Sequence, residues 1–164
     1  MEPQTGNAAV TRMSRVEWNP RAGVVANAQR RLPRLAEEFF SQVGVALAGD
    51  PDAGQLHRVR LAAKHMRYTL ELFRACYGPA LEQRIESLRQ LQQVLGEIND
   101  CSVARRLVLA GRPSPNRTKA ERFLTERQRD KTAELRKRWA EGMGAAHEQR
   151  SWIRYLAQHA REPR

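Results

Sequence analysis

Apolar residues recur every three or four positions along most of the chain, the spacing of helices with one buried face. Such stripes cover residues 24–48, 55–76, 79–97, 99–110, 117–143 and 147–160. Segments rich in Gly and Pro separate several of them, at 49–54, 78–79 and 111–116. No segment alternates apolar and polar residues as a half-buried strand does. We therefore predict an all-α fold, an antiparallel helical bundle of four to five helices.

Two positions complicate this pattern. Pro33 lies inside the first stripe, where it either kinks the helix or marks the start of its main body. Asn99 and Asp100 are good N-cap residues, so we expect one helix to end near residue 97 and another to begin there. Residues 1–20 show no periodicity and are predicted to form a flexible polar tail with Trp18 as its one anchor. The helical domain then covers residues 21–160.

Composition narrows the class of protein. A chain of 164 residues with 41% hydrophobic and 29% charged residues fits one globular domain. It has no long apolar run, no apolar stretch near its start, and only two cysteines. We therefore expect a cytoplasmic protein with reduced thiols, without a membrane span, a signal peptide or a disulfide framework.

Charge gives the first functional indication. The formal net charge is +11, and residues 101–164 carry 16 basic and 7 acidic residues. Such a surplus favours polyanionic partners, namely nucleic acid, polyphosphate or an anionic membrane. A solvated surface that is merely basic gives the same composition.

A dense group of basic residues follows one side of the helix predicted at 55–76. At about 100° per residue, four side chains fall within roughly 80° of His57 around this helix: Arg60, Lys64, Arg67 and Tyr68. Successive rows rise ~5 Å, which is comparable to the repeat between phosphates. A linear polyanion fits along this side of the helix, but so does a solvated basic face partly neutralised by Glu71. Spacing alone leaves both interpretations open.

Two motifs in the right order resemble a known family. His57-x-x-Arg60-x-x-x-Lys64-x-x-Arg67-Tyr68-x-x-Glu71 resembles the repeat motif of the CHAD domain, the conserved histidine α-helical domain. The segment 91–100, LQQVLGEIND, resembles its second landmark, a leucine-glycine turn that ends in Asn-Asp. Trp139 and the segment 152–156 resemble the end of such a repeat, so the resemblance covers roughly residues 24–156.

The resemblance implies an all-helical module that binds inorganic polyphosphate through a basic surface, at polyphosphate granules, without catalysis or a cofactor. Carried onto this chain, it implies phosphate contacts from His57, Arg60, Lys64 and Arg67, with Tyr68 hydrogen-bonded locally or to phosphate. Asn99 and Asp100 would order the helix junction. Further candidate contacts are His65, Arg105 and Arg106.

The chain departs from the family pattern in two ways. CHAD domains have two such repeats, and this chain has one motif and room for one repeat, which looks like the second. Either a second copy of the chain completes the surface, or a single repeat binds as half a site. His65-Met66 stands where a basic-leucine pair is common. That change either removes a phosphate contact or exchanges it for one that depends on pH.

An enzyme is the first alternative, and the sequence argues against it. His57 and His65 lie roughly 80° apart and more than two turns apart along a helix, too far to share a metal ion easily. The chain has no phosphate-binding loop, dinucleotide-binding turn or nucleophile elbow. Cys76 fits a small core residue better than a nucleophile. We therefore expect no catalytic residue and no metal site.

Nucleic-acid binding is the second alternative. Nine basic residues lie between 117 and 138, but Glu121, Asp130 and Glu134 are interleaved with them. A run of this kind is typical of a solvated, partly salt-bridged face. No aromatic residue interrupts it in the manner of a base-stacking platform. Non-specific binding of nucleic acid or another polyanion stays open as the less favoured interpretation, and membrane attachment is disfavoured further.

Overall fold

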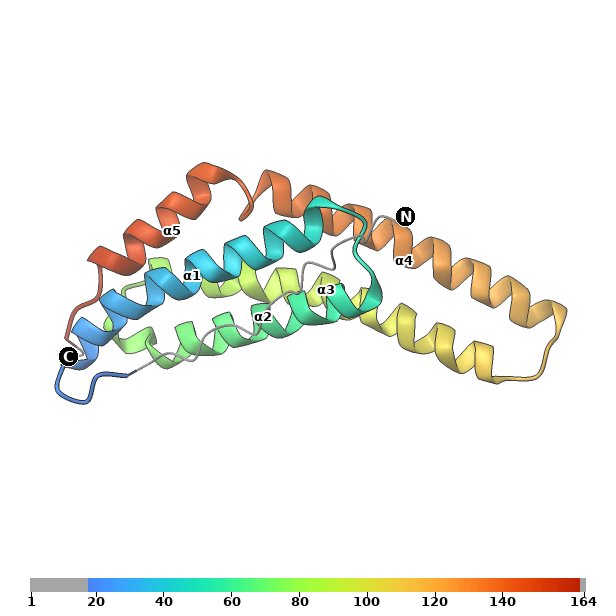
Figure 1. The fold of residues 1–164 in the computed structure, drawn as a ribbon, viewed down its shortest axis with the longest axis horizontal. Coiled ribbons are helices and arrows are strands. Elements are labelled where there is room, and N and C mark those ends of the chain that lie inside the picture. Colours follow the sequence, from blue (N-terminus) through green and yellow to red (C-terminus); the bar gives the residue numbers. More distant parts are fainter. Residues whose placement is uncertain (1–17, 163–164) are drawn as a thin grey trace, which may run out of the picture.

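The computed structural model describes residues 18–162, and all regular secondary structure in that range is helical (Figure 1). The helices are α1 Val24–Ala48, α2 Ala53–Leu72, α3 Ala80–Ala110, α4 Pro115–Glu141 and α5 Ala146–Gln158, with a 3₁₀ turn, η1, at Arg74–Cys76. The predicted all-α bundle is confirmed. The predicted tail falls mostly outside the described residues, but Trp18 is described, and its ring stacks on Phe73 at 6.2 Å between centroids.

The helices from α1 to α4 follow one another up and down, and α5 returns along α1 (Figure 1). The core lies among α1, α2, α5 and the first part of α3, with the last part of α4 against it. The second half of α3 and the first half of α4 extend beyond this body as a two-helix hairpin (Figure 1). No residue between Cys101 and Thr132 is buried. The hairpin is therefore held mainly by contacts between its own two helices.

The predicted break at Asn99 and Asp100 is wrong, because α3 runs without interruption from Ala80 to Ala110. Ile98 and Cys101, on either side of the pair, are both buried and continue the apolar stripe of α3. Capping preference is local and is worth about 1 kcal/mol. Burial of a continuous stripe outweighs it, so the two side chains lie in the middle of a helix and order no junction.

The two ends of α2 differ in how well the sequence predicts them. At its start Asp52 accepts a hydrogen bond from the backbone N–H of Gln55, and the Gln55 side chain accepts one from the backbone N–H of Asp52. At its end α2 stops at Leu72, four residues before the predicted end, and η1 follows. The tighter turn brings Tyr77 into the core, where its hydroxyl donates to the backbone carbonyl of Leu156 at 2.7 Å.

One of the two alternatives at Pro33 is excluded. α1 begins at Val24, nine residues earlier, and includes Pro33 in its interior. The main body of the helix therefore does not begin at the proline. The buried residues Leu32 and Leu35 on either side of it continue the core stripe through this point.

Four aromatic side chains pack α1, the end of α4 and the middle of α5 together. Trp139 of α4 packs edge-on against Phe39 at 6.0 Å, and Trp152 of α5 packs edge-on against Phe40 at 5.6 Å. The turn from α4 to α5 passes close to the first of these rings. A Cβ atom added at Gly144 would lie 2.5 Å from Nε1 of Trp139 and 2.6 Å from its carbonyl oxygen. Only glycine fits at this position without displacing the indole.

We expect Gly144→Ala to lower the free energy of unfolding by about 1–3 kcal/mol, the usual effect of forcing extra volume into a packed site. The matched control is Gly44→Ala in α1, where an added Cβ meets nothing within 4 Å. This change should instead stabilise the helix by about 0.5–1 kcal/mol. Urea unfolding of both variants checks the prediction, and equal stability of the two would contradict it.

Candidate anion-binding surface

The five residues predicted to bind phosphate all lie on the outer side of α2. We call them the strip: His57, Arg60, Lys64, Arg67 and Tyr68. His57, Lys64 and Tyr68 are exposed, and the two arginines are partly buried. The opposite side of α2 carries its buried residues, Leu56, Val59, Ala62, Ala63, Met66 and Leu70. From its first to its last residue the strip extends about 16 Å along the helix axis.

Three cationic or titratable side chains of the strip have no counterion among residues 18–162. His57, Arg60 and Lys64 form no ion pair and no side-chain hydrogen bond there. Lys64 has one favourable contact, with its Nζ atom 5.5 Å from the centroid of the Tyr68 ring. Positive charge therefore gathers along one exposed helix face without internal neutralisation.

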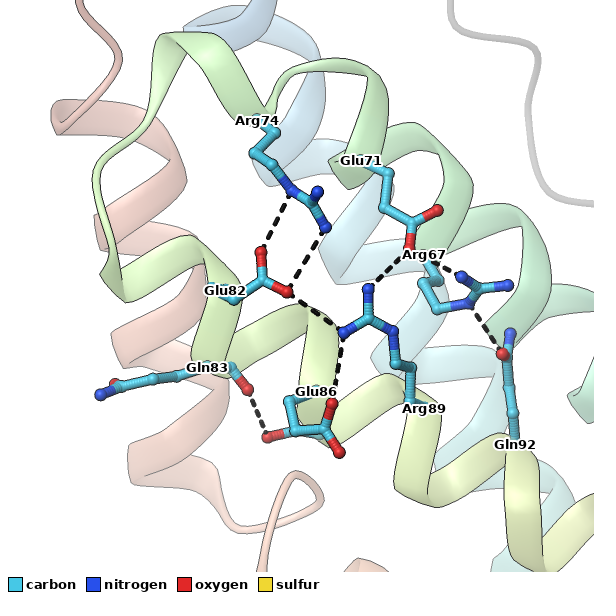
Figure 2. A network of polar contacts seen from close by, with 9 residues as sticks. Arg67, Glu71, Arg74, Glu82, Gln83, Glu86, Arg89 and Gln92 are labelled. Carbon is cyan, nitrogen blue, oxygen red and sulfur yellow. Dashed lines mark hydrogen bonds and ion pairs between the residues drawn. The ribbon is translucent and has the colours of Figure 1, made fainter.

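Arg67 is different, because its charge is shared with a neighbouring carboxylate (Figure 2). Its Nη1 donates to Oε1 of Glu71 at 2.6 Å, and its Nε donates to Oε1 of Gln92 on α3 at 2.8 Å. Its guanidinium also lies 4.5 Å from the centroid of the Tyr68 ring. Arg67 thus fixes α2 against α3. At this end of the strip the interpretation of a partly neutralised basic face is correct.

The contacts of Arg67 belong to a longer chain of ion pairs between α2, η1 and α3 (Figure 2). Arg89 donates to Glu71 at 3.2 Å, to Glu82 at 3.1 Å and to Glu86 at 3.3 Å. Arg74 of η1 pairs with Glu82 at 3.1 Å. The three glutamates raise the pKa of Arg89 through these hydrogen bonds, so its charge is retained. The network ends at Arg67 and does not reach the rest of the strip.

The same contacts fix the register of the two antiparallel helices. Arg67 lies level with Gln92, and Glu71 lies level with Arg89. Carried along both helices, this register brings Gly96 to the level of Lys64 and Asn99 to the level of Arg60. Gly96 and Asn99 lie within roughly 40° of Gln92 around α3, so they share its face. Three residues of the 91–100 segment thus follow the edge of the strip.

The additional candidate contacts do not all lie near the strip. Arg106 lies roughly 40° from Gln92 around α3, so it continues the same face to the level of the start of α2. Arg105 lies roughly 140° from Gln92 and points away from this face. His65 is exposed at the Tyr68 edge of the strip, roughly 60° from Tyr68 around α2, beside Leu61 and Leu72, which are 48% and 78% exposed. Arg105 is therefore the candidate that lies away from the strip.

Sequence reasoning did not identify Arg89, Gln92 and Gly96 as neighbours of the strip. Gln92 and Gly96 were part of a recognised motif, but only as a helix landmark. Their position beside the strip becomes visible once α3 is known to be one continuous helix.

The basic run of α4 is salt-bridged over its second half only. Lys131 pairs with Glu97 of α3 at 2.8 Å and with Glu134 at 3.0 Å, and Arg138 pairs with Glu134 at 2.6 Å. The hydrogen bond to Glu97 raises the pKa of Lys131, and the one from Lys131 lowers the pKa of Glu134. In α4, the exposed basic side chains without an ion pair within the described residues are Lys119, Arg122, Arg127, Arg129, Arg136 and Lys137.

Other kinds of site find little support in the described part of the chain. Between residues 18 and 162, no three His, Cys, Asp or Glu side chains gather as metal ligands would. In the same range no helix is both long and apolar enough to cross a membrane. Cys76 and Cys101 are buried free thiols, and burial raises the pKa of Cys76, which opposes the reactive thiolate form.

Fold and surface together define an all-helical protein with an uncompensated basic helix face. The family model of the CHAD domain matches residues 8–109, well over half of the chain, and the chain therefore belongs to the CHAD domain family. The match includes the strip and the 91–100 segment and begins within the predicted tail. Trp139 and the segment 152–156 lie beyond it. No curated protein and no solved structure matches the chain significantly.

Proposed function

We propose that this protein is an inorganic polyphosphate-binding module, without catalytic activity, that holds the polyanion along the strip of α2. The observation that carries the proposal is the row of His57, Arg60 and Lys64, which are without a counterion among the described residues. Membership of a family known for polyphosphate binding supports the same ligand. Binding in the cytoplasm at polyphosphate granules is part of the proposal.

The arrangement suits a flexible chain of phosphates better than a compact ligand. Arg60 and Lys64 are one turn apart, about 6 Å along the axis, so each can contact a different phosphate. Arginine offers a planar fork to phosphate oxygens, whereas lysine offers a point charge. None of the pockets described in this structure is lined by the strip. An extended ligand lying on an open face needs no pocket.

Titration with long-chain polyphosphate at physiological salt, with duplex DNA as competitor, tests the proposal. Tight binding that DNA does not displace supports it. Displacement by DNA at equal charge concentration would instead favour non-specific nucleic-acid binding, through the exposed basic residues of the hairpin. A fluorescent fusion that fails to gather at granules in polyphosphate-rich cells would contradict the proposed localisation.

Gly96 provides a sharper test, because an added methyl group there affects the ligand and the fold in opposite directions. A Cβ at this position meets nothing within 4 Å in the protein, and the register places it beside Lys64. We expect Gly96→Ala to stabilise the fold by about 0.5–1 kcal/mol. We also expect it to weaken polyphosphate binding several-fold, because the methyl group projects toward the bound chain.

The control for this variant is Gly44→Ala in α1, which also adds a methyl group to open space inside a helix. It should give a similar gain in stability with unchanged binding. Urea unfolding and a polyphosphate titration of both variants check the prediction. Unchanged binding in Gly96→Ala would mean that the polyanion does not approach α3 at this level.

Self-association through the outer side of α2 is the second part of the proposal. Leu61 and Leu72 are exposed, and they lie with His65 on one side of the helix at the edge of the strip. A second copy of the chain packed there would cover these side chains and bring two strips together, as in a two-repeat domain. Light scattering should then give a dimer mass, and Leu72→Gln should give a monomer. A monomer mass for the unmodified chain would mean that one repeat binds alone.

A further inference from the structure

A second basic site lies at the other side of α3, against α5. A pocket of about 360 Å³ is lined by three arginines, two histidines, a serine and a tyrosine, and by no carboxylate. The basic lining residues are Arg84 from α3 and His147, Arg150, Arg154 and His159 from α5 or its end. None of them belongs to the strip, and of these residues only Arg154 lies in a segment that the sequence singled out, 152–156.

Arg84 is a partly buried cation without a carboxylate partner among residues 18–162. Its guanidinium donates to the carbonyl of Ala80 at 3.0 Å and to Oγ of Ser151 at 3.3 Å, and it lies 4.0 Å from the centroid of the Tyr155 ring. Its Nε atom is buried and has no hydrogen-bond partner. Burial lowers the pKa of Arg84, as expected for a cation removed from water, and the charges of Tyr155 and, after it, Glu148 oppose this.

The α5 residues place more positive charge around this guanidinium. His147, Arg150 and Arg154 follow one another at intervals of three and four, so they line one side of the helix. Arg150 and Arg154 are exposed and form no ion pair within the described chain. The ring of His159 stacks on Tyr155 at 4.9 Å, and His159 lines the same pocket as Arg84. Like charges gathered in this way repel one another unless an anion lies among them.

We propose that this pocket binds a compact phosphate anion, either free or as the end of a short condensed phosphate. Arginine forks together with the hydroxyl of Ser151 match phosphate oxygens. The Tyr155 ring already contacts Arg84 and His159, so it is not a platform for a nucleotide base. The site is separate from the strip, because Arg84 lies roughly 80° around α3 and about 12 Å along it from Gln92, the α3 residue that contacts the strip. It does not depend on the function proposed for the strip.

The four histidines of the chain make the two sites distinguishable in one experiment. His57 and His65 lie on α2, and His147 and His159 lie in this pocket. In imidazole NMR spectra of the full chain, diphosphate should shift the resonances of His147 and His159 at concentrations that leave those of His57 and His65 unchanged. Orthophosphate and a phosphomonoester, added separately, show whether a free or a terminal phosphate is preferred. Sulfate serves as the anion of similar shape.

The double variant R150A/R154A should weaken diphosphate binding at the pocket about tenfold or more, because two charge-assisted contacts are lost. Both side chains are exposed and form no ion pair, so the fold should be retained, which circular dichroism checks. The control R127A/R129A removes the same charge from the hairpin and should leave the affinity within twofold. The proposal is overturned if diphosphate leaves His147 and His159 unshifted, if all four histidines titrate together, or if both double variants lose equal affinity.

Discussion

Replacing Arg60 and Lys64 together by glutamine should lower the affinity for long-chain polyphosphate by about 100-fold or more. Neither side chain has an ion pair or a side-chain hydrogen bond within the described chain, so their charges are available to the ligand. A hydrogen bond to a charged group contributes about 1.5–3 kcal/mol, and two such contacts account for the expected loss. Isothermal titration at physiological salt measures it. The fold should be retained, because neither residue belongs to the core.

The matched control is R127Q/R129Q, which removes the same charge from exposed positions of the hairpin. It should change the affinity for polyphosphate only a few-fold, because it lowers the overall electrostatic attraction of the protein and removes no direct contact. The slope of log affinity against log salt should also fall by about one to two units in the strip variant alone, because fewer counterions are released. Equal losses in the two variants would show that the whole basic surface attracts the ligand and that the strip has no special part.

Arg67 is a poor substitute for Arg60 in this experiment, although both belong to the same motif. Its side chain holds Glu71 and Gln92, so its removal disturbs the packing of α2 on α3 along with any phosphate contact. A loss of binding in an Arg67 variant would therefore have two explanations. The pair of Arg60 and Lys64 avoids this ambiguity.

Helical periodicity predicts the elements well where a stripe is both local and complete. In α2 the buried residues recur at intervals of three and four from Leu56 to Leu70, and the predicted helix is confirmed over nearly all of its length. The prediction is wrong at Asn99 and Asp100, where a local capping preference competes with burial of Ile98 and Cys101. Burial of these two apolar side chains outweighs the capping preference. How strongly it does so depends on the surrounding core and cannot be inferred from Asn99 and Asp100 alone.

The composition of the strip could be predicted, whereas its electrostatic state could not. That Arg60, Lys64 and Tyr68 share a face follows from positions within one helix. The pair of Arg67 with Glu71 lies within one helix and could be predicted as well. That Gln92 and Arg89 join this pair, and that no carboxylate of the described residues reaches Arg60, depends on side chains that approach from another helix. The directions of Arg105 and Arg106 relative to the strip likewise require α3 to be continuous. Their angles from Gln92 are defined only if one unbroken helix joins these residues.

The pocket at α5 could be predicted from the sequence even less than the charge state of the strip. Arg84 and Ser151 are 67 positions apart in sequence, and their hydrogen bond exists because α5 packs back beside the start of α3. Basic residues at three- and four-residue intervals in 147–154 resemble any solvated helix face. Only the partly buried guanidinium opposite them distinguishes this face from such a surface.

Phe39→Ala should lower the free energy of unfolding by about 3–5 kcal/mol, whereas Phe123→Ala should change it by less than about 0.5 kcal/mol. The side chain of Phe39 is fully buried and packs against Trp139 of α4, so its removal leaves a cavity between α1 and α4. Phe123 is 60% exposed on the hairpin and has little packing to lose. Urea unfolding at low protein concentration compares the same substitution in the two environments.

The Phe123 variant is informative in a second way, because the hairpin carries exposed apolar side chains at Leu107 and Phe123. If Phe123→Ala destabilises the protein only at high concentration, the hairpin contacts a second copy, since stability that depends on association varies with concentration. A destabilisation equal to that of Phe39→Ala at every concentration would contradict the placement of the hairpin outside the core. A small effect at all concentrations would mean that the hairpin is held by α3 and α4 alone, and that any dimer forms through the outer side of α2.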